Sequence, residues 1–175
     1  MKVIFNLIFL FTTVFATAQS QDESQDIVAH IDELTQLWDA DAKKLYTYTG
    51  LEQYCKTKAY RDKTISTLNY IHHYDSVLYD IVSKKYDTNA DKEAKATLED
   101  IKLLEVEYTT KSFLKFLHKE CGGYNFIESN LSAPEYKSEY NKEVARLEKE
   151  LKKYVSSITK QIDIIDEHVH HLKGL

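Results

Sequence analysis

The chain has 175 residues and a formal net charge of −5, with 28 acidic against 23 basic side chains. This balance argues against a nucleic-acid partner, which needs a basic face, and against simple electrostatic attachment to anionic lipid. One proline and four glycines are too few for an architecture of strands and tight turns. Length and composition together predict a single all-α domain.

The N-terminus has the pattern of a secretory leader. Lys2 precedes an apolar run from Val3 to Phe15, and Ala16-Thr17-Ala18 supplies small residues at the positions that a signal peptidase reads. We predict a signal peptide over residues 1–18, cleaved after Ala18. An uncleaved anchor is the alternative, but the apolar run of about 16 residues is shorter than the ~20 that a membrane span needs. We therefore expect an exported protein, periplasmic or secreted, without an integral membrane segment after processing.

The mature chain is expected to begin with a disordered segment, residues 19–25, followed by one helical domain, residues 26–175. A first helix over 26–48 carries apolar residues at helical spacing, namely Ile27, Ile31, Leu34, Trp38 and Leu45. Gly50 is a natural stop, because glycine adopts the left-handed conformation that closes many helices. A second helix is predicted over 51–86.

A third helix is predicted over 90–120, after the capping residues of Asp87-Thr88-Asn89. Its apolar face shifts around the helix past Tyr108, which indicates burial on two sides or a bend. Gly122-Gly123 is expected to end it. The connection over 124–131 then carries three apolar residues that would plug one end of the domain, Tyr124, Phe126 and Ile127.

The last helix, over 133–172, gives the strongest signal in the chain. Its start has the features of a capping box, with Ser132, Pro134 and Glu135 in the expected places. One narrow apolar stripe then continues to the C-terminus: Tyr140, Val144, Leu147, Leu151, Tyr154, Ile158, Ile162, Ile165, Val169 and Leu172. Such a stripe must lie against other long helices. We therefore predict an elongated, antiparallel, up-down four-helix bundle with coiled-coil-like packing. The same stripe could serve as a homodimer seam.

The two cysteines are expected to form a disulfide. Cys55 lies in the second predicted helix and Cys121 ends the third. Their midpoint is Thr88, in the predicted turn, so an antiparallel hairpin places them side by side. An exported protein meets an oxidising compartment, where such a pair forms a bond. Two unpaired thiols are the alternative.

The histidines suggest one metal-site hypothesis. His168, His170 and His171 crowd the C-terminal turn, and His168 and His171 share a helical face that a nearby carboxylate could complete. The alternative is that histidines simply suit a helix C-terminus, where the helix dipole favours positive charge. No cofactor is predicted.

Thirteen tyrosines are the unusual feature of the composition. Most are expected at the edge of the core, with buried rings and solvated hydroxyls. The functional alternative is an exposed aromatic surface for a protein or glycan, with Tyr70 and Tyr74, one turn apart, as the candidate pair.

No catalytic constellation is visible, since the chain has neither a nucleophile-elbow sequence nor a glycine-rich phosphate loop. The leading hypothesis is an exported, non-enzymatic bundle that acts by binding an unidentified protein or envelope partner. The alternative is a metal- or small-ligand-binding bundle that uses the histidines. A membrane-active bundle ranks below both, because no uninterrupted apolar segment follows the leader.

Overall fold

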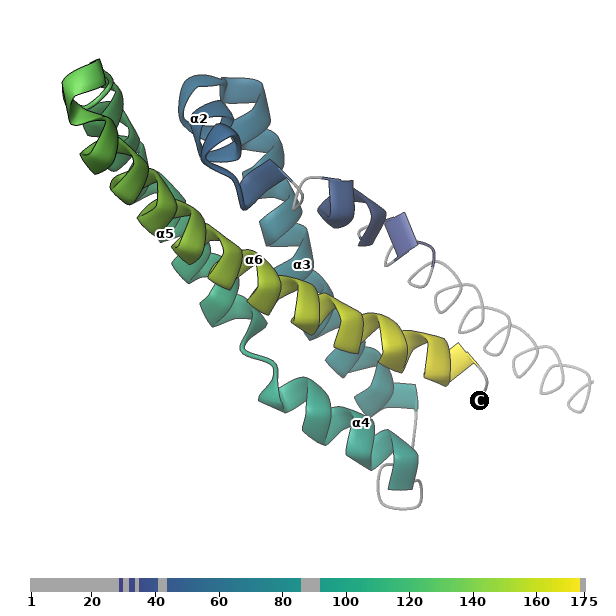
Figure 1. Ribbon diagram of the computed structural model, residues 1–175. Coiled ribbons are helices and arrows are strands. Elements are labelled where there is room, and N and C mark those ends of the chain that lie inside the picture. The colour runs from purple at the N-terminus through teal and green to yellow at the C-terminus, as the bar shows by residue number, and fades with distance from the viewer. Residues whose placement is uncertain (1–28, 30–31, 34, 41–43, 86–91, 174–175) are drawn as a thin grey trace, which may run out of the picture.

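The computed structural model describes residues 29, 32–33, 35–40, 44–85 and 92–173 (Figure 1). Every regular element in this part of the chain is helical, which confirms the all-α prediction. The predicted leader and the segment over 19–25 lie outside the described residues. The elements are α2 (Tyr48–Lys56), α3 (Lys58–Lys85), α4 (Lys92–Leu103), α5 (Val106–Asn130), the short 3-10 helix η1 (Pro134–Tyr136) and α6 (Lys137–Lys173).

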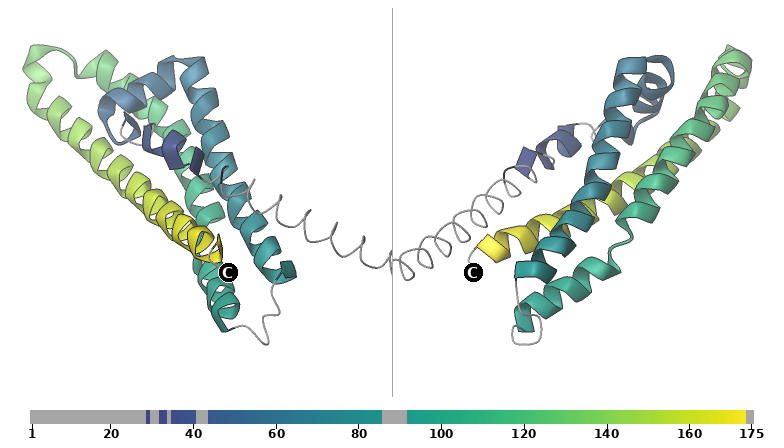
Figure 2. Two further views of the ribbon diagram at one scale, coloured as in Figure 1. Left: turned by 90° about the vertical axis from the view of Figure 1, so that its right-hand side faces the viewer. Right: turned by 180° about the vertical axis from the view of Figure 1, so that it is seen from behind.

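Helix α5 is the central element of the fold. It packs against α2, α3 and α6, and α6 makes smaller contacts with α2 and α3 (Figures 1 and 2). Helices α5 and α6 form an antiparallel hairpin, and α3 also runs opposite to α5. Because much of the predicted helix over 26–48 lies outside the described residues, the complete four-helix topology stays a prediction.

The core lies between the inner face of α5 and the helices around it. Phe113, Leu117, Tyr124 and Ile127 are at most 1% exposed and lie on one face of α5. From α6, the predicted stripe supplies Leu147, Leu151, Ile158, Ile162 and Ile165, all buried. Each of these side chains contributes about 1.5–3 kcal/mol relative to exposure. The side chains of Val169 and Leu172 lie outside the described residues.

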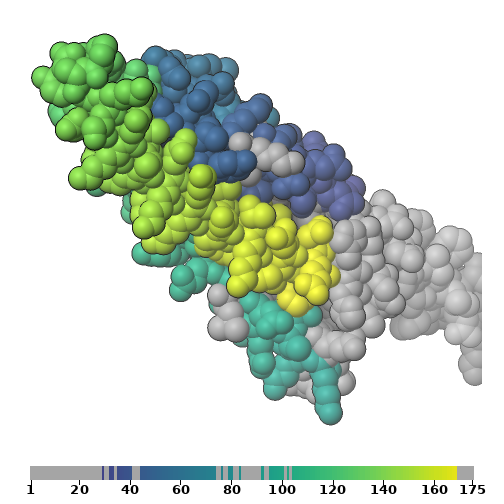
Figure 3. Space-filling view, in the orientation of Figure 1, coloured from purple at the N-terminus to yellow at the C-terminus, as the bar shows by residue number. Residues whose placement is uncertain are grey.

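Residues near the N-terminus pack against α6. Residues 35–40 are helical, and Trp38 is 1% exposed. Its indole Nε1 donates a hydrogen bond to Thr159 Oγ1 at 2.9 Å, so the polar edge of the buried ring is satisfied. Figure 3 shows this segment, in purple and blue, lying along α6, in green and yellow.

The first predicted helix boundary is wrong by a few residues. The chain turns at Tyr46 and Thr47, and α2 begins at Tyr48. Thr47 caps α2, because its hydroxyl accepts a hydrogen bond from the Gly50 amide at 3.0 Å. Gly50 is therefore an interior residue of α2 and does not stop a helix. The turn needs glycine there for space, because a Cβ atom would overlap the backbone of Lys44.

The predicted helices over 51–86 and 90–120 are each broken. Thr57 takes an extended conformation, φ −110° and ψ 108°, between α2 and α3. The second break lies between α4 and α5, at Leu104 and Glu105 (Figure 2). The first break has a physical reason. Ten residues separate Tyr54 from the next core residue of α3, Thr64, and a straight helix would carry the second about 80° away from the first.

Helix α5 runs through Gly122 and Gly123, so the predicted helix end at 120 and the predicted loop over 124–131 are wrong. The core face continues past the glycines, since Tyr124 and Ile127 are each 1% exposed. Gly123 also leaves room for a buried carboxylate. A Cβ atom at Gly123 would lie 2.7 Å from Glu120 Oε2, and that oxygen accepts from Arg146 Nη2 at 3.3 Å.

The two glycines are expected to respond differently to alanine. Gly122→Ala should raise the free energy of unfolding by about 0.5–1 kcal/mol, because alanine favours a helix and nothing lies within 4 Å of the new Cβ. Gly123→Ala should gain less, because Glu120 must move away from Arg146. Urea titration of both variants measures the difference. Equal gains would contradict the role assigned to Gly123.

The last helix follows its predicted stripe, and its start differs in detail. Ala133, not Ser132, is the N-cap of η1, and no side chain accepts a hydrogen bond there. The predicted capping box is therefore absent, although Pro134 does occupy the first turn. The chain passes from η1 directly into α6, which spans Lys137–Lys173.

Candidate functional site

The most prominent exposed apolar groups of the described chain lie on the outer face of α5. Tyr108 is 71% exposed and Phe126 is 58% exposed. Lys115 and Lys119 lie between them and are also exposed. We call these four residues the α5 strip. Their spacing of seven, four and seven residues places them on one face of a helix.

The sequence of α5 produces this strip because its two faces differ. The inner face carries the core residues Phe113 and Leu117, both fully buried. Residues about half a turn away on the same helix must then face outward. From Tyr108 to Phe126 the strip is about 27 Å long at 1.5 Å per residue. It is a linear surface on a rigid element.

The strip carries positive charge without acidic residues on the same face. The two positions that complete this face are Ser112 and Gly122. Lys111, beside the strip, forms an ion pair with Glu107. Lys119 has a side chain that is 82% exposed, and its Nζ lies 4.0 Å from Glu120 Oε1. A contact this exposed contributes little to stability, so the ammonium group remains available to solvent.

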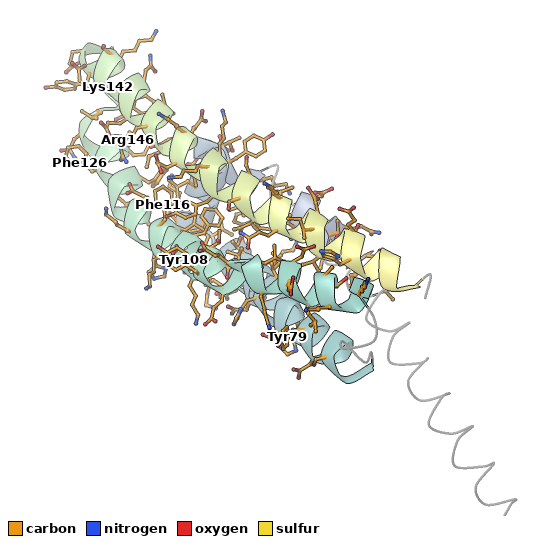
Figure 4. All side chains as sticks on the ribbon, turned by 90° about the horizontal axis from the view of Figure 1, so that it is seen from below. Tyr79, Tyr108, Phe116, Phe126, Lys142 and Arg146 are labelled. Atoms are coloured by element: carbon orange, nitrogen blue, oxygen red, sulfur yellow. A yellow bond between two sulfur atoms is a disulfide. The ribbon has the colours of Figure 1, made fainter. Side chains whose placement is uncertain are left out.

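Helix α6 borders the strip on one side. Figure 4 shows Phe126, Phe116 and Tyr108 following one another along α5, with Arg146 on the neighbouring α6. Phe116 is half-buried because its ring contacts Tyr154, with centroids 5.2 Å apart. Arg146 is held by Glu143 at 2.8 Å and by Glu120 at 3.3 Å. The guanidinium group of Arg146 is therefore engaged in ion pairs within the α5–α6 hairpin. Lys115 and Lys119 are then the cations of the strip that remain accessible to a partner.

The structure describes one member of the tyrosine pair predicted as a partner surface. Tyr70 is 56% exposed on α3, while the side chain of Tyr74 lies outside the described residues. Exposed residues on the same face of α3 include Ser66, one turn back, and Lys63, two turns back. Tyr70 is therefore an exposed ring beside polar residues, and its pairing with Tyr74 stays a prediction.

The structure describes only part of the predicted histidine site. His168 Nε2 lies 3.5 Å from Asp100 Oδ2, which links α6 to α4. The side chains of His170 and His171 lie outside the described residues. Among the side chains that are described, no group of three or more histidine, cysteine, aspartate and glutamate residues is placed to hold a metal ion. The proposed metal site stays a prediction.

The structure brings the two cysteines together. Cys55 Sγ and Cys121 Sγ are 2.05 Å apart, and the Cα atoms are 5.3 Å apart, as in a disulfide. The bond joins the last turn of α2 to α5. The predicted antiparallel register is therefore correct at this point, although the turn at Thr88 lies outside the described residues. Both cysteines are half-buried. We interpret the bond as a structural link between the two helices.

A cluster of tyrosines surrounds this end of the molecule. The hydroxyl groups of Tyr48 and Tyr140 both donate to Glu128 Oε1, at 2.9 and 3.1 Å. Tyr124 donates to Glu52 Oε1 at 3.0 Å, and its ring lies 5.4 Å from that of Tyr48. These bonds connect α2, α5 and α6. Tyr48 and Tyr140 are half-buried, as predicted for tyrosines at the core edge, whereas Tyr124 is only 1% exposed.

Alkaline pH is expected to unfold the protein through these tyrosines. Burial raises the pKa of Tyr48, Tyr54, Tyr124 and Tyr140 above the ordinary value near 10, and the carboxylate of Glu128 adds to this for Tyr48 and Tyr140. The unfolded chain releases these protons near pH 10 and the folded chain holds them longer. Stability that is fully present below pH 10 is therefore lost as the pH rises through the folded pKa values.

Urea midpoints at pH 8, 9, 10 and 11 test this expectation, with tyrosine ionisation followed by ultraviolet absorbance. The midpoint should fall above pH 10, and Tyr48→Phe should make the fall less steep. A midpoint that stays constant from pH 9 to 11 would show that the tyrosines ionise equally in both states.

The α5 strip is a site that the sequence interpretation missed. Phe126 was expected to plug the end of the domain and Tyr108 to lie on the apolar face. Of the three expected plug residues, Tyr124 and Ile127 are buried and Phe126 is exposed. The available signal was the spacing from Tyr108 to Phe126, which is five helical turns, but it becomes visible only once the helix continues through the glycines.

Comparison with known proteins adds no further constraint on the site. No family model, curated protein or solved structure matches this chain. Within the described residues, none of the helices combines the length and the apolar character required to cross a membrane.

Proposed function

We propose that this chain is an exported, non-enzymatic helical-bundle protein that binds a partner protein along the α5 strip. The observation that carries the proposal is the exposure of two large aromatic residues, Tyr108 at 71% and Phe126 at 58%, on one face of a rigid helix. Exposed aromatic residues are enriched at protein interfaces.

The export half of the proposal rests on the leader sequence and the cysteine pair. The apolar run ending at Ala16-Thr17-Ala18 has the form of a cleaved signal peptide. A bonded Cys55–Cys121 pair suits an oxidising compartment. The mass of the chain recovered from an exporting cell should correspond to a start at Gln19 with the cysteines bonded. A full-length mass with free thiols would contradict export.

Site-specific photo-crosslinking in the source cell tests the binding half. A p-benzoylphenylalanine residue is placed at position 108 or 126, replacing Tyr108 or Phe126, and in a third variant it replaces Tyr70. Tyr70 is the matched control, because it is an aromatic residue 56% exposed on another helix. We expect one discrete crosslinked protein from positions 108 and 126 and none from position 70.

The outcomes separate the rival surfaces. Crosslinking at position 70 alone would place the interface on α3 and contradict binding through the α5 strip. Equal crosslinking at all three positions would indicate unspecific contact. A diffuse product that a glycosidase removes would identify a glycan as the bound molecule, and would contradict the proposed protein partner.

A further inference from the structure

We infer that the α5 strip binds an acidic helix of a different protein and does not pair with a second copy of this chain. The inference rests on the proposed function and names the chemistry of its partner. It follows from the order of side chains along the strip, which is aromatic, lysine, lysine, aromatic, at positions 108, 115, 119 and 126.

The order of side chains along the strip disfavours a homodimer formed through this face. A symmetric dimer interface places the same residues on both sides of a two-fold axis. The strip is centred on residue 117, so antiparallel pairing sets Lys115 opposite Lys119 of the second copy. Parallel pairing sets each lysine opposite itself. Like charges meet at the centre in both cases, and such contacts oppose association.

An acidic partner satisfies every group of the strip. Two carboxylates four residues apart on a helix would meet Lys115 and Lys119, which are four residues apart. Apolar residues further along that helix would cover Tyr108 and Phe126. A helix that matches the strip, about 27 Å long, contains about 18 residues. The acidic residues of this chain that could compete are engaged by other cations: Glu107 by Lys111, and Glu143 and Glu120 by Arg146. The contact of Glu120 with Lys119, at 4.0 Å, is the longer of the two that this carboxylate makes.

The net charge of the chain also favours binding of an acidic partner at the strip. The chain carries a net charge of −5, so an acidic ligand has no general attraction to the molecule and needs a local group of cations. Lys115 and Lys119 supply such a group on the face that also carries the two exposed aromatic residues. Charges of this kind contribute to partner choice and association rate more than to the final affinity.

Charge variants in the same crosslinking experiment test the inference. With the crosslinker at position 126, the yield is compared between the parent lysines and the Lys115→Glu, Lys119→Glu double variant. The matched control is Lys149→Glu with Lys152→Glu, which changes the net charge equally at exposed positions on α6. We expect the yield to fall about tenfold for the strip variant and to stay near the parent level for the control.

Each outcome has a separate meaning. If the parent and the strip variant crosslink equally well, the inference of an acidic partner is overturned. The proposed binding function still stands in that case. A product with twice the mass of the chain would identify a second copy and overturn the inference. Equal losses in both double variants would assign the effect to net charge and overturn it as well. No crosslink in the parent would contradict the proposed function itself.

Discussion

Removing the disulfide is expected to lower the free energy of unfolding by about 4 kcal/mol. The bond closes a loop across a sequence separation of 66 residues. In the chain-entropy model, a crosslink stabilises a protein because it restricts the unfolded chain, and the effect increases with the length of the loop. The loop includes the last turn of α2, all of α3 and α4, and most of α5.

The double variant Cys55→Ala, Cys121→Ala measures this contribution by urea unfolding. Dithiothreitol treatment of the parent protein should reproduce the loss and should leave the double variant unchanged. The native fold should survive, because Tyr124 and Tyr48 still join α2 to its neighbours through Glu52 and Glu128. Equal stability of the oxidised and reduced parent would show that the bond contributes nothing to the folded state.

Replacing Gly50 is expected to have an effect of similar size. A Cβ atom at Gly50 would lie 1.8 Å from the Lys44 carbonyl oxygen and 2.5 Å from its carbon. Both are backbone atoms, so a side-chain rotation cannot relieve the clash. Leu45, the next residue, is fully buried, which opposes movement of this segment. Gly50→Ala should therefore destabilise the protein by about 3 kcal/mol, despite the higher helix propensity of alanine.

Gly122→Ala is the matched control for this experiment, because it makes the same chemical change in a helix with free space around the new Cβ. The two variants should change the urea midpoint in opposite directions. A Gly50→Ala protein as stable as the parent would contradict the close approach of α2 to the preceding turn.

The sequence predicts best where one helix face alone decides the structure. The stripe of α6 was predictable, because Leu147, Leu151 and Ile158 recur at helical spacing and Pro134 marks the start. The pairing of Cys55 with Cys121 was predictable because an antiparallel register needs only positions along the chain. The first prediction depends on local periodicity and the second on the antiparallel register of two neighbouring helices.

The errors arise where tertiary contacts override local preference. Glycine costs about 1 kcal/mol in a helix, so Gly122-Gly123 indicated a helix end. Burial of Tyr124 and Ile127, each worth about 1.5–3 kcal/mol, favours continuation by a larger amount. Gly50 is required by a backbone contact with Lys44, which composition and spacing cannot reveal.

The α5 strip was not predicted because its exposure also depends on tertiary contacts. An aromatic residue in an amphipathic helix is more often in the core than on the surface. Tyr108 and Phe126 become an exposed pair only because α5 is one continuous helix between them. Tyr70 was selected from its spacing to Tyr74, and it is indeed 56% exposed, while the pair itself stays a prediction.

Native mass spectrometry of the untagged protein from exporting cells tests the central claim most directly. The parent is expected as a 1:1 complex between the processed chain and one other polypeptide. The Tyr108→Ala, Phe126→Ala variant should appear as the free chain, while Tyr70→Ala should keep the complex. A complex that survives loss of both strip aromatics, or a parent found only as the free chain, would contradict binding through the α5 strip.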